Sequence, residues 1–195
     1  MTATRTPIPR RSSGGARPFR WSRKEFVRAA DDGAFGERTV ELIDGEIYEK
    51  MGENHPHRQS TRRAMTALRL AFGAAGVVQA ETGLPLGNRS QPKPDLSVLR
   101  GTDADYAQRE EGPEDVALVV EIVDSRRDTA QQKIKLYGAA GLPEYWILDL
   151  RTRTLVVHRD PHAKGYARVE TRDETATVCP LERPDAPVAV ADLLP

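Results

Sequence analysis

The chain has 195 residues and no formal net charge, because 29 basic residues balance 29 acidic ones. This length predicts one domain, with or without a tail, and is enough to bury a hydrophobic core without disulfides. A single cysteine, Cys179, excludes an internal disulfide and a CxxC zinc site and favours a reducing compartment such as the cytoplasm. No apolar run approaches the roughly 18 residues that a membrane helix needs, so we expect no membrane partner.

The charges are unevenly distributed along the chain. The stretch from Arg5 to Lys24 has seven basic residues and no acidic one, whereas acidic residues outnumber basic ones from Asp103 to Asp128. A basic arm and an acidic metal-binding centre would give this pattern, and so would a solvated tail and an acidic surface loop. Composition predicts that residues 1–20 are a disordered basic tail and that residues 21–195 form a single domain.

The first half of this domain begins with a short helix from the predicted N-cap Ser22 to about Ala30. Asp44-Gly45, flanked by extended segments, is a strong hairpin signal and predicts a β-hairpin over 38–51. Apolar residues at steps of three and four then predict a helix over 57–74, with its arginines mostly on the other faces.

The second half alternates strands with one further helix. Strands are predicted at 77–82, 95–100 and 117–123, a helix from Asp128 or Thr129 to about 140, and strands at 144–150 and over TLVVHR, with weaker patterning around 166–169 and 186–190. The order after the hairpin is helix, three strands, helix, strand. It predicts a mixed α/β domain in which a mixed β-sheet is flanked by helices.

Glu121 is the most informative residue because it lies inside ALVVEIV, the most apolar predicted strand. A buried carboxylate is normally paired, protonated or bound to a metal. Alternation places Glu121 on one face of the strand with Val119 and Val123. Taken alone, a structural salt bridge to an arginine explains it equally well.

Asp95 suggests a second carboxylate nearby. It follows Pro94 at the start of the preceding predicted strand, on the face shared by Lys93 and Ser97. If the two strands are neighbours, Asp95 and Glu121 approach each other, and two close carboxylates repel unless a cation lies between them. Oxygen ligands of this kind suit Mg²⁺ or Mn²⁺.

Several motifs now combine into a recognisable pattern. They are ELIDGEIYE at 41–49, His57 at a helix start, KPDLSVL at 93–99, LVVEIVDS at 118–125 followed by RRD, Lys133, Tyr137, and GLPEYWILD at 141–149. Together they resemble the PD-(D/E)XK nuclease superfamily, and most closely its Uma-type restriction endonucleases. The resemblance spans about residues 20–195 and implies a restriction-endonuclease-like core.

One position departs from the superfamily pattern. The lysine of the E-x-K motif should stand at 123, where this chain has Val123. Related branches take the lysine from the following helix, so Lys133 is the expected replacement and Lys93 the second choice. Lys135, two residues further on, should point away from the sheet. For both lysines of this helix, and for Lys135 in particular, the simpler interpretation is a position on the solvent-exposed face.

The resemblance also implies roles for Glu41 and His57, although the first could be an outward hairpin residue and the second an ordinary helix-start residue. A metal site built on His55 and His57, or a nucleophilic pair of Cys179 with His158 or His162, finds little support in the spacing. Tyr137, Tyr145 and Trp146 are expected in the core.

The function implied is a metal-dependent endonuclease acting on phosphodiester bonds in DNA. In it Asp95 and Glu121 hold Mg²⁺ or Mn²⁺, and Lys133 stabilises charge on the phosphoryl oxygens. Nothing in the chain reads a base sequence, and a homodimer is left open. The alternative, favoured by Val123, is a nucleic-acid- or partner-binding module that keeps the fold without catalysis.

Overall fold

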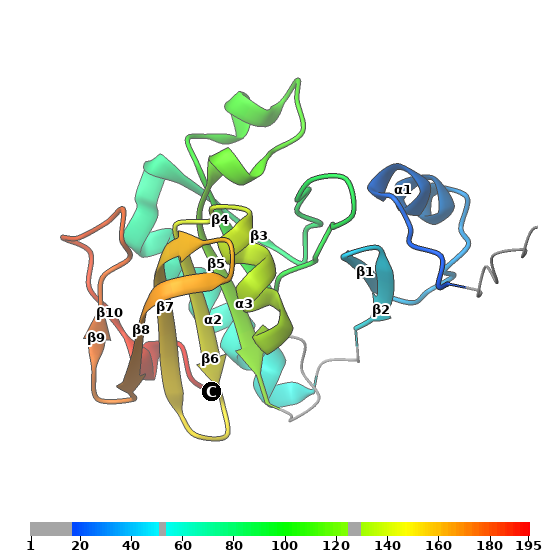
Figure 1. The fold of residues 1–195 in the computed structure, drawn as a ribbon. Helices are drawn as coiled ribbons and strands as arrows, with labels where there is room; N and C mark the ends of the chain where they lie inside the picture. The colour runs from blue at the N-terminus through cyan, green and yellow to red at the C-terminus, as the bar shows by residue number, and fades with distance from the viewer. Residues whose placement is uncertain (1–16, 51–53, 125–129) are drawn as a thin grey trace, which may run out of the picture.

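A mixed six-stranded sheet forms the centre of the computed structural model, which describes residues 17–50, 54–124 and 130–195 (Figure 1). The strand order across the sheet is β3-β4-β5-β6-β7-β8. β5 and β6 run parallel, and every other neighbouring pair in this sheet is antiparallel. The strand bounds are β3 Gly76–Ala80, β4 Leu96–Arg100, β5 Val116–Val123, β6 Glu144–Asp149, β7 Thr154–His162 and β8 Gly165–Asp173.

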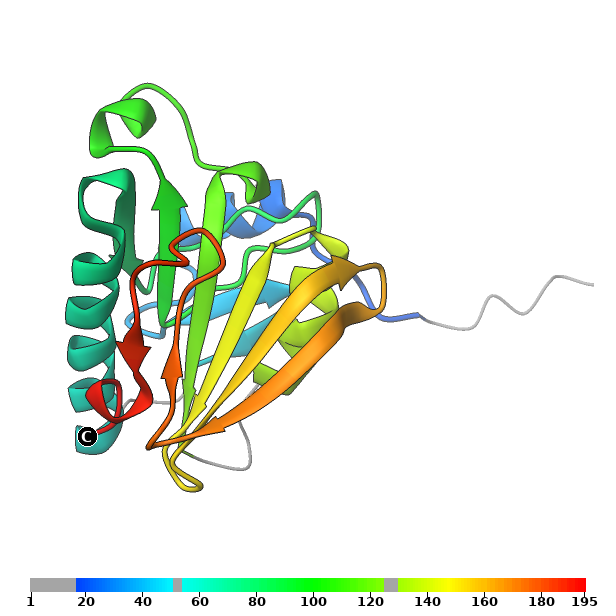
Figure 2. The same cartoon turned by 90° about the vertical axis from the view of Figure 1, so that its left-hand side faces the viewer.

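Two helices cover opposite faces of the sheet, as the turned view makes clear (Figure 2). α2, His55–Phe72, packs Ala64, Leu68 and Phe72 against even-numbered residues of β5 such as Val120. α3, Ala130–Ala139, packs on the other face, in the core that holds Val119 and Val123 of the same strand. The alternation of β5 therefore separates two hydrophobic cores, one under each helix.

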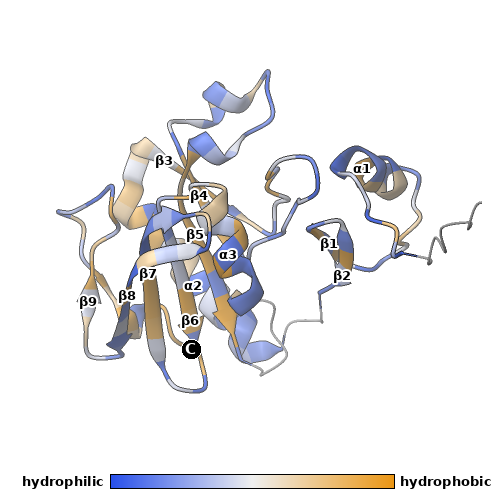
Figure 3. Ribbon diagram, in the orientation of Figure 1, coloured by the Kyte–Doolittle hydropathy of each residue, from blue (hydrophilic) through white to orange (hydrophobic). Residues whose placement is uncertain are grey.

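β5 is buried along nearly its whole length because the parallel pair β5 and β6 lies under helices on both faces. Colouring by hydropathy shows the apolar residues concentrated in these central strands, with polar residues in the surrounding loops (Figure 3). Glu121 interrupts this apolar run at a buried position, on the α3 side of the sheet.

An N-terminal helix and a β-hairpin lie beside the sheet (Figure 1). α1, Arg23–Asp31, begins at Ser22, whose hydroxyl accepts a hydrogen bond from the Glu25 backbone in a capping box. The hairpin consists of β1 and β2, Val40–Ile43 and Glu46–Glu49. Its turn has positive φ at both Asp44 and Gly45, as the Asp-Gly signal predicts.

Short elements complete the described chain. β9 pairs with β10 near the C-terminus, and single turns of 3-10 helix connect the larger elements. Their bounds are β9 Thr177–Val178, β10 Val188–Ala189, and 3-10 turns Gly73–Ala75, Asp103–Tyr106, Pro113–Asp115 and Val190–Asp192.

The expected fold class and element order are confirmed, with differences at the ends. α2 begins at His55 rather than 57 because Asn54 accepts a hydrogen bond from the His57 backbone and acts as the N-cap. It ends at Phe72 because Gly73 adopts a positive φ. β7 and β8 are longer than predicted, because they pair with each other from Thr154 opposite Asp173 to His162 opposite Gly165. β9 was not predicted. The predicted tail up to residue 16 and the predicted N-cap at 128 or 129 lie outside the described residues.

Candidate metal centre

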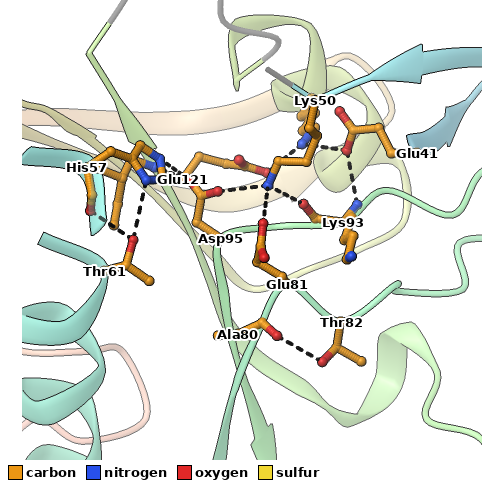
Figure 4. Close-up of polar contacts among 12 residues, drawn as sticks. Glu41, Lys50, His57, Thr61, Ala80, Glu81, Thr82, Lys93, Asp95 and Glu121 are labelled. Atoms are coloured by element: carbon orange, nitrogen blue, oxygen red, sulfur yellow. Dashed lines mark hydrogen bonds and ion pairs between the residues drawn. The ribbon is translucent and has the colours of Figure 1, made fainter. Parts of the chain in front are cut away.

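Asp95 and Glu121 lie next to each other because their strands are neighbours. β4 and β5 pair antiparallel with Leu96 opposite Val120, and Asp95, just before β4, accepts a hydrogen bond from the backbone of Ile122, the residue after Glu121. Both residues are only 2% exposed. Figure 4 shows both carboxylates directed into one polar cluster between the sheet and the β1–β2 hairpin. Two buried carboxylates on one face require positive partners nearby.

Lys133 supplies the first of these partners. It lies on the face of α3 that packs on the sheet, is 0% exposed, and its Nζ lies 2.8 Å from Glu121 Oε1 and 2.8 Å from Glu41 Oε2. Burial by itself lowers the pKa of this lysine, but the negative charges of Glu121 and Glu41 outweigh it and raise the pKa. Lys133 therefore forms ion pairs with two carboxylates from separate elements.

Glu121 has a second hydrogen-bond donor besides Lys133. Its Oε1 also accepts a hydrogen bond from the Tyr137 hydroxyl at 3.0 Å. Burial raises the pKa of Glu121 to about 7, and the negative charge of Asp95 adds to the rise, while Lys133 opposes it. Burial therefore makes Glu121 easier to protonate than an ordinary glutamate, and the charge of Lys133 limits this effect.

Glu41 is fully buried and is not an outward residue of the hairpin. One carboxylate oxygen contacts Lys133, and the same oxygen accepts a hydrogen bond from the Lys93 backbone at 3.0 Å. Glu41 thereby joins the β1–β2 hairpin to α3 and to the segment that leads into β4. The side chain connects three elements rather than facing solvent.

Asp95 is anchored by donors on both carboxylate oxygens. Oδ2 accepts from the Ile122 backbone at 2.7 Å and lies 3.3 Å from His57 Nε2. Oδ1 lies 2.8 Å from Lys50 Nζ. Burial by itself raises the pKa of Asp95, but the His57 hydrogen bond and the Lys50 charge outweigh it and lower the pKa to about 2. Asp95 is therefore ionised under physiological conditions.

Lys50 was not anticipated from the sequence. It follows β2, and its Nζ lies 2.8 Å from Asp95 Oδ1, 3.1 Å from the Lys93 carbonyl oxygen and 3.6 Å from Glu81 Oε1 (Figure 4). No periodic signal marks this residue, because it stands just beyond a short strand and its partners lie far along the chain. Glu81 was missed for the same reason, and Tyr137 was expected in the core without a role in the cluster.

The remaining candidate residues lie differently. Lys93 contributes its backbone N–H and carbonyl oxygen to the cluster, and the contacts that Figure 4 draws for it come from these backbone atoms. Lys135 is exposed on α3, as expected for a residue two positions from Lys133. His55 is exposed at the start of α2. His158 is buried near Tyr145 instead of pairing with Cys179 as a nucleophile.

The donor set suits some metal ions better than others. Among the described residues no three histidine, cysteine, aspartate or glutamate side chains converge as a ready-made metal cage. Mg²⁺ is commonly held by one or two carboxylates, with water and substrate phosphate completing its shell. Asp95 and Glu121, with carbonyl and carboxylate oxygens beside them, fit this kind of site and not a closed transition-metal site.

These features define a nuclease-like fold with a buried carboxylate–lysine centre, and comparisons with known proteins agree. A crystal structure described as "a putative nuclease belonging to DUF820 from Anabaena variabilis ATCC 29413" aligns with a TM-score of 0.69 at 19% identity, over 89% of this chain and 97% of that chain. At 19% identity, this similarity shows that the two chains share a fold. A search of curated proteins gave no match.

The chain belongs to the Uma2 family, described as "Putative restriction endonuclease", whose family model matches residues 24–190. This confirms the resemblance predicted from the sequence motifs. Family and fold together support a nuclease. In the described part of the chain, no helix combines the length and apolar character needed to cross a membrane.

Proposed function

We propose that this protein is a divalent-metal-dependent endonuclease that hydrolyses phosphodiester bonds in DNA. The observation that carries the proposal is the convergence of Asp95, Glu121 and Lys133 from two neighbouring strands and the helix that follows them. Two buried carboxylates beside one lysine are the groups that metal-assisted phosphodiester hydrolysis uses. The chain supplies them within the fold of a nuclease family.

In this proposal Asp95 and Glu121 hold Mg²⁺ or Mn²⁺. When bound, the ion would polarise a phosphate oxygen and lower the pKa of a water molecule. His57 and the Ile122 backbone fix the orientation of the Asp95 carboxylate through Oδ2 and leave Oδ1 directed into the cluster. Orientation of a ligand by such hydrogen bonds is typical of metal sites.

Lys133 has the role of a charge stabiliser in this proposal, replacing the lysine absent at Val123. Its ammonium is held between Glu121 and Glu41, so its position is fixed before substrate arrives. A positioned cation stabilises charge that develops on phosphoryl oxygens without reorganisation during the reaction. Glu41 is then a positioning residue that acts through Lys133.

DNA as the substrate rests on the family and on the charge near the site. His57, which contacts Asp95, lies in the first turn of α2, and exposed arginines continue along that helix at Arg58, Arg62 and Arg69. Arginines near a nuclease centre can contact backbone phosphates, which orient a duplex without reading its sequence. Solvated arginines on a surface helix are the alternative.

The test is cleavage of supercoiled and linear DNA by the full chain with Mg²⁺, Mn²⁺ or a chelator. We expect metal-dependent nicking or linearisation that Asp95→Asn and Glu121→Gln each reduce to the level of the chelated sample. The exposed carboxylate variant Asp185→Asn is the matched control and should cleave like the unmodified chain. Metal-dependent DNA binding without cleavage by the unmodified chain would instead favour a non-catalytic binding module.

A further inference from the structure

The two lysines of the cluster are held in different ways. Lys133 is 0% exposed and lies 2.8 Å from two carboxylates, whereas the Lys50 side chain is 16% exposed and has one carboxylate at 2.8 Å and another at 3.6 Å. Lys50 also reaches the cluster from just beyond the end of β2, whereas Lys133 lies within a helix. Lys50 therefore has the weaker contacts of the two lysines and is the more accessible to solvent.

Within residues 17–50, 54–124 and 130–195, three oxygens contact the Lys50 ammonium. They are Asp95 Oδ1, Glu81 Oε1 and the Lys93 carbonyl oxygen, and the Glu121 carboxylate is close enough for its charge to raise the pKa of Lys50. Carboxylate and carbonyl oxygens are the ligands that hard divalent cations take. A cation already lies on Asp95 Oδ1, the oxygen that faces the cluster.

Charge balance indicates that this place can accept more positive charge than Lys50 supplies. The described residues bring together the carboxylates of Glu41, Glu81, Asp95 and Glu121, the ammonium groups of Lys50 and Lys133, and the imidazole of His57. The four carboxylates outnumber these basic groups even when His57 carries a proton, so replacement of one ammonium by a divalent ion would improve the balance. A divalent ion and the Lys50 ammonium cannot both contact the same oxygens, because their positive charges repel each other at that distance.

We infer that the Lys50 ammonium occupies the cation position on Asp95 Oδ1 and must leave it when a divalent ion binds. Lys50 is thus an internal competitor that sets the metal affinity of the centre, and the inference rests on the proposed metal-binding function. Its freed ammonium would remain at the open side of the cluster. Lys133, enclosed by Glu41 and Glu121, would stay in place.

Mn²⁺ binding by the full chain, followed through the electron paramagnetic resonance signal of free Mn²⁺, tests the inference without an activity assay. Lys50→Met should bind Mn²⁺ about tenfold or more tightly than the unmodified chain, because a charge-assisted contact no longer has to be broken. Lys50→Arg keeps the cation and should retain the weaker affinity. Lys50→Gln serves as a second neutral replacement if Lys50→Met does not fold, as judged by circular dichroism.

Lys135→Met is the matched control, because it removes one exposed lysine charge from α3, outside the cluster. It should leave Mn²⁺ affinity close to that of the unmodified chain. Equal or weaker binding by the neutral Lys50 variants, or an equal gain in Lys135→Met, would overturn competition by Lys50 while leaving the proposed metal site intact. Absence of Mn²⁺ binding in every variant would overturn both.

Discussion

Lys133 illustrates how strongly a single buried charge is tied to its surroundings. Its ammonium has no access to solvent and contacts two buried carboxylates from β1 and β5. An alanine at this position would leave both carboxylates buried without this cation.

Replacement of Lys133 by alanine should therefore lower both stability and cleavage. Loss of one partner of a buried ion pair costs about 3–5 kcal/mol of unfolding free energy. Loss of a positioned electrostatic donor costs about 10²–10³ in rate. Chemical denaturation measures the first quantity, and DNA cleavage at a temperature where the variant is still folded measures the second.

Lys135→Ala is the control for this experiment, because Lys135 is exposed on the same helix. It should change the unfolding free energy by no more than about 0.5 kcal/mol and leave cleavage unchanged. Equal losses in the two variants would contradict the proposed role of Lys133.

His158 is a buried residue whose protonation state should affect stability away from the metal centre. Its Nδ1 lies 3.3 Å from the Tyr145 carbonyl oxygen, and its ring stacks on the Tyr145 ring at 5.4 Å. Burial lowers the pKa of His158 below its usual value, although hydrogen bonds to backbone carbonyls partly oppose this. The folded chain thus resists protonation of this ring more than the unfolded chain does.

Stability should accordingly fall as the pH falls. A histidine with a lowered folded pKa contributes stability above its unfolded pKa of about 6.5, and that contribution is lost as the pH drops through the folded pKa. His158→Phe, which keeps an aromatic ring, should reduce the loss in melting temperature between about pH 7.5 and 5.5. His162→Gln, which replaces an exposed histidine, should leave this loss in melting temperature unchanged. If the loss is also unchanged in His158→Phe, His158 is not the group responsible for it.

At the scale of elements, α3 carries the lysine of the centre and must pack closely on β8. Gly138 permits this contact, because a Cβ added there would lie 2.0 Å from the carbonyl oxygen of Gly165. The clash is with backbone, which cannot rotate away as a flexible side chain could. The position of Lys133 relative to Glu121 therefore depends on a glycine about one turn further along the helix.

Gly138→Ala should destabilise the chain even though alanine favours helices. An overpacked core typically costs about 1–3 kcal/mol, which exceeds the roughly 0.5–1 kcal/mol that alanine gains over glycine in a helix. Thermal and urea unfolding would measure the difference. Gln132→Ala, on the exposed face of α3, is the control and should be neutral or slightly stabilising. A stabilised Gly138→Ala variant would show that α3 can move away from β8 freely.

At the scale of the whole molecule, the balanced net charge conceals a basic N-terminal stretch. Residues 1–16 contain Arg5, Arg10 and Arg11 and no acidic residue. If this stretch binds DNA, its deletion should weaken DNA binding. It should also reduce the slope of the logarithm of the DNA-binding constant against the logarithm of salt concentration, by about 0.9 for each phosphate that the stretch neutralises. Binding titrations at several salt concentrations would measure the slope.

The same deletion should leave the melting temperature unchanged, because the composition of residues 1–16 predicts a disordered tail. Trypsin should likewise trim the first 20 residues and leave a stable product over 21–195, as the domain prediction expects. An unchanged salt slope would identify the stretch as a solvated tail. Rapid digestion of the entire chain would contradict the single-domain boundary.

Local sequence signals were sufficient for the elements and for the pair of metal-ligand candidates. Asp44-Gly45 predicted the hairpin because few residue pairs adopt two positive φ angles. The apolar run around Glu121 predicted a buried strand, and alternation predicted its face. These signals act over a few residues, so the chain reveals them without its tertiary structure.

The surroundings of the centre were decided only by the tertiary structure. Lys50 and Asp95 are 45 positions apart in the chain, and neither belongs to a pattern that would pair them. Glu41 could be read as an outward hairpin residue until the hairpin was seen to contact α3 and the segment before β4. Burial, pKa shifts and competition between cations depend on which distant groups meet, and packing of the whole chain determines that.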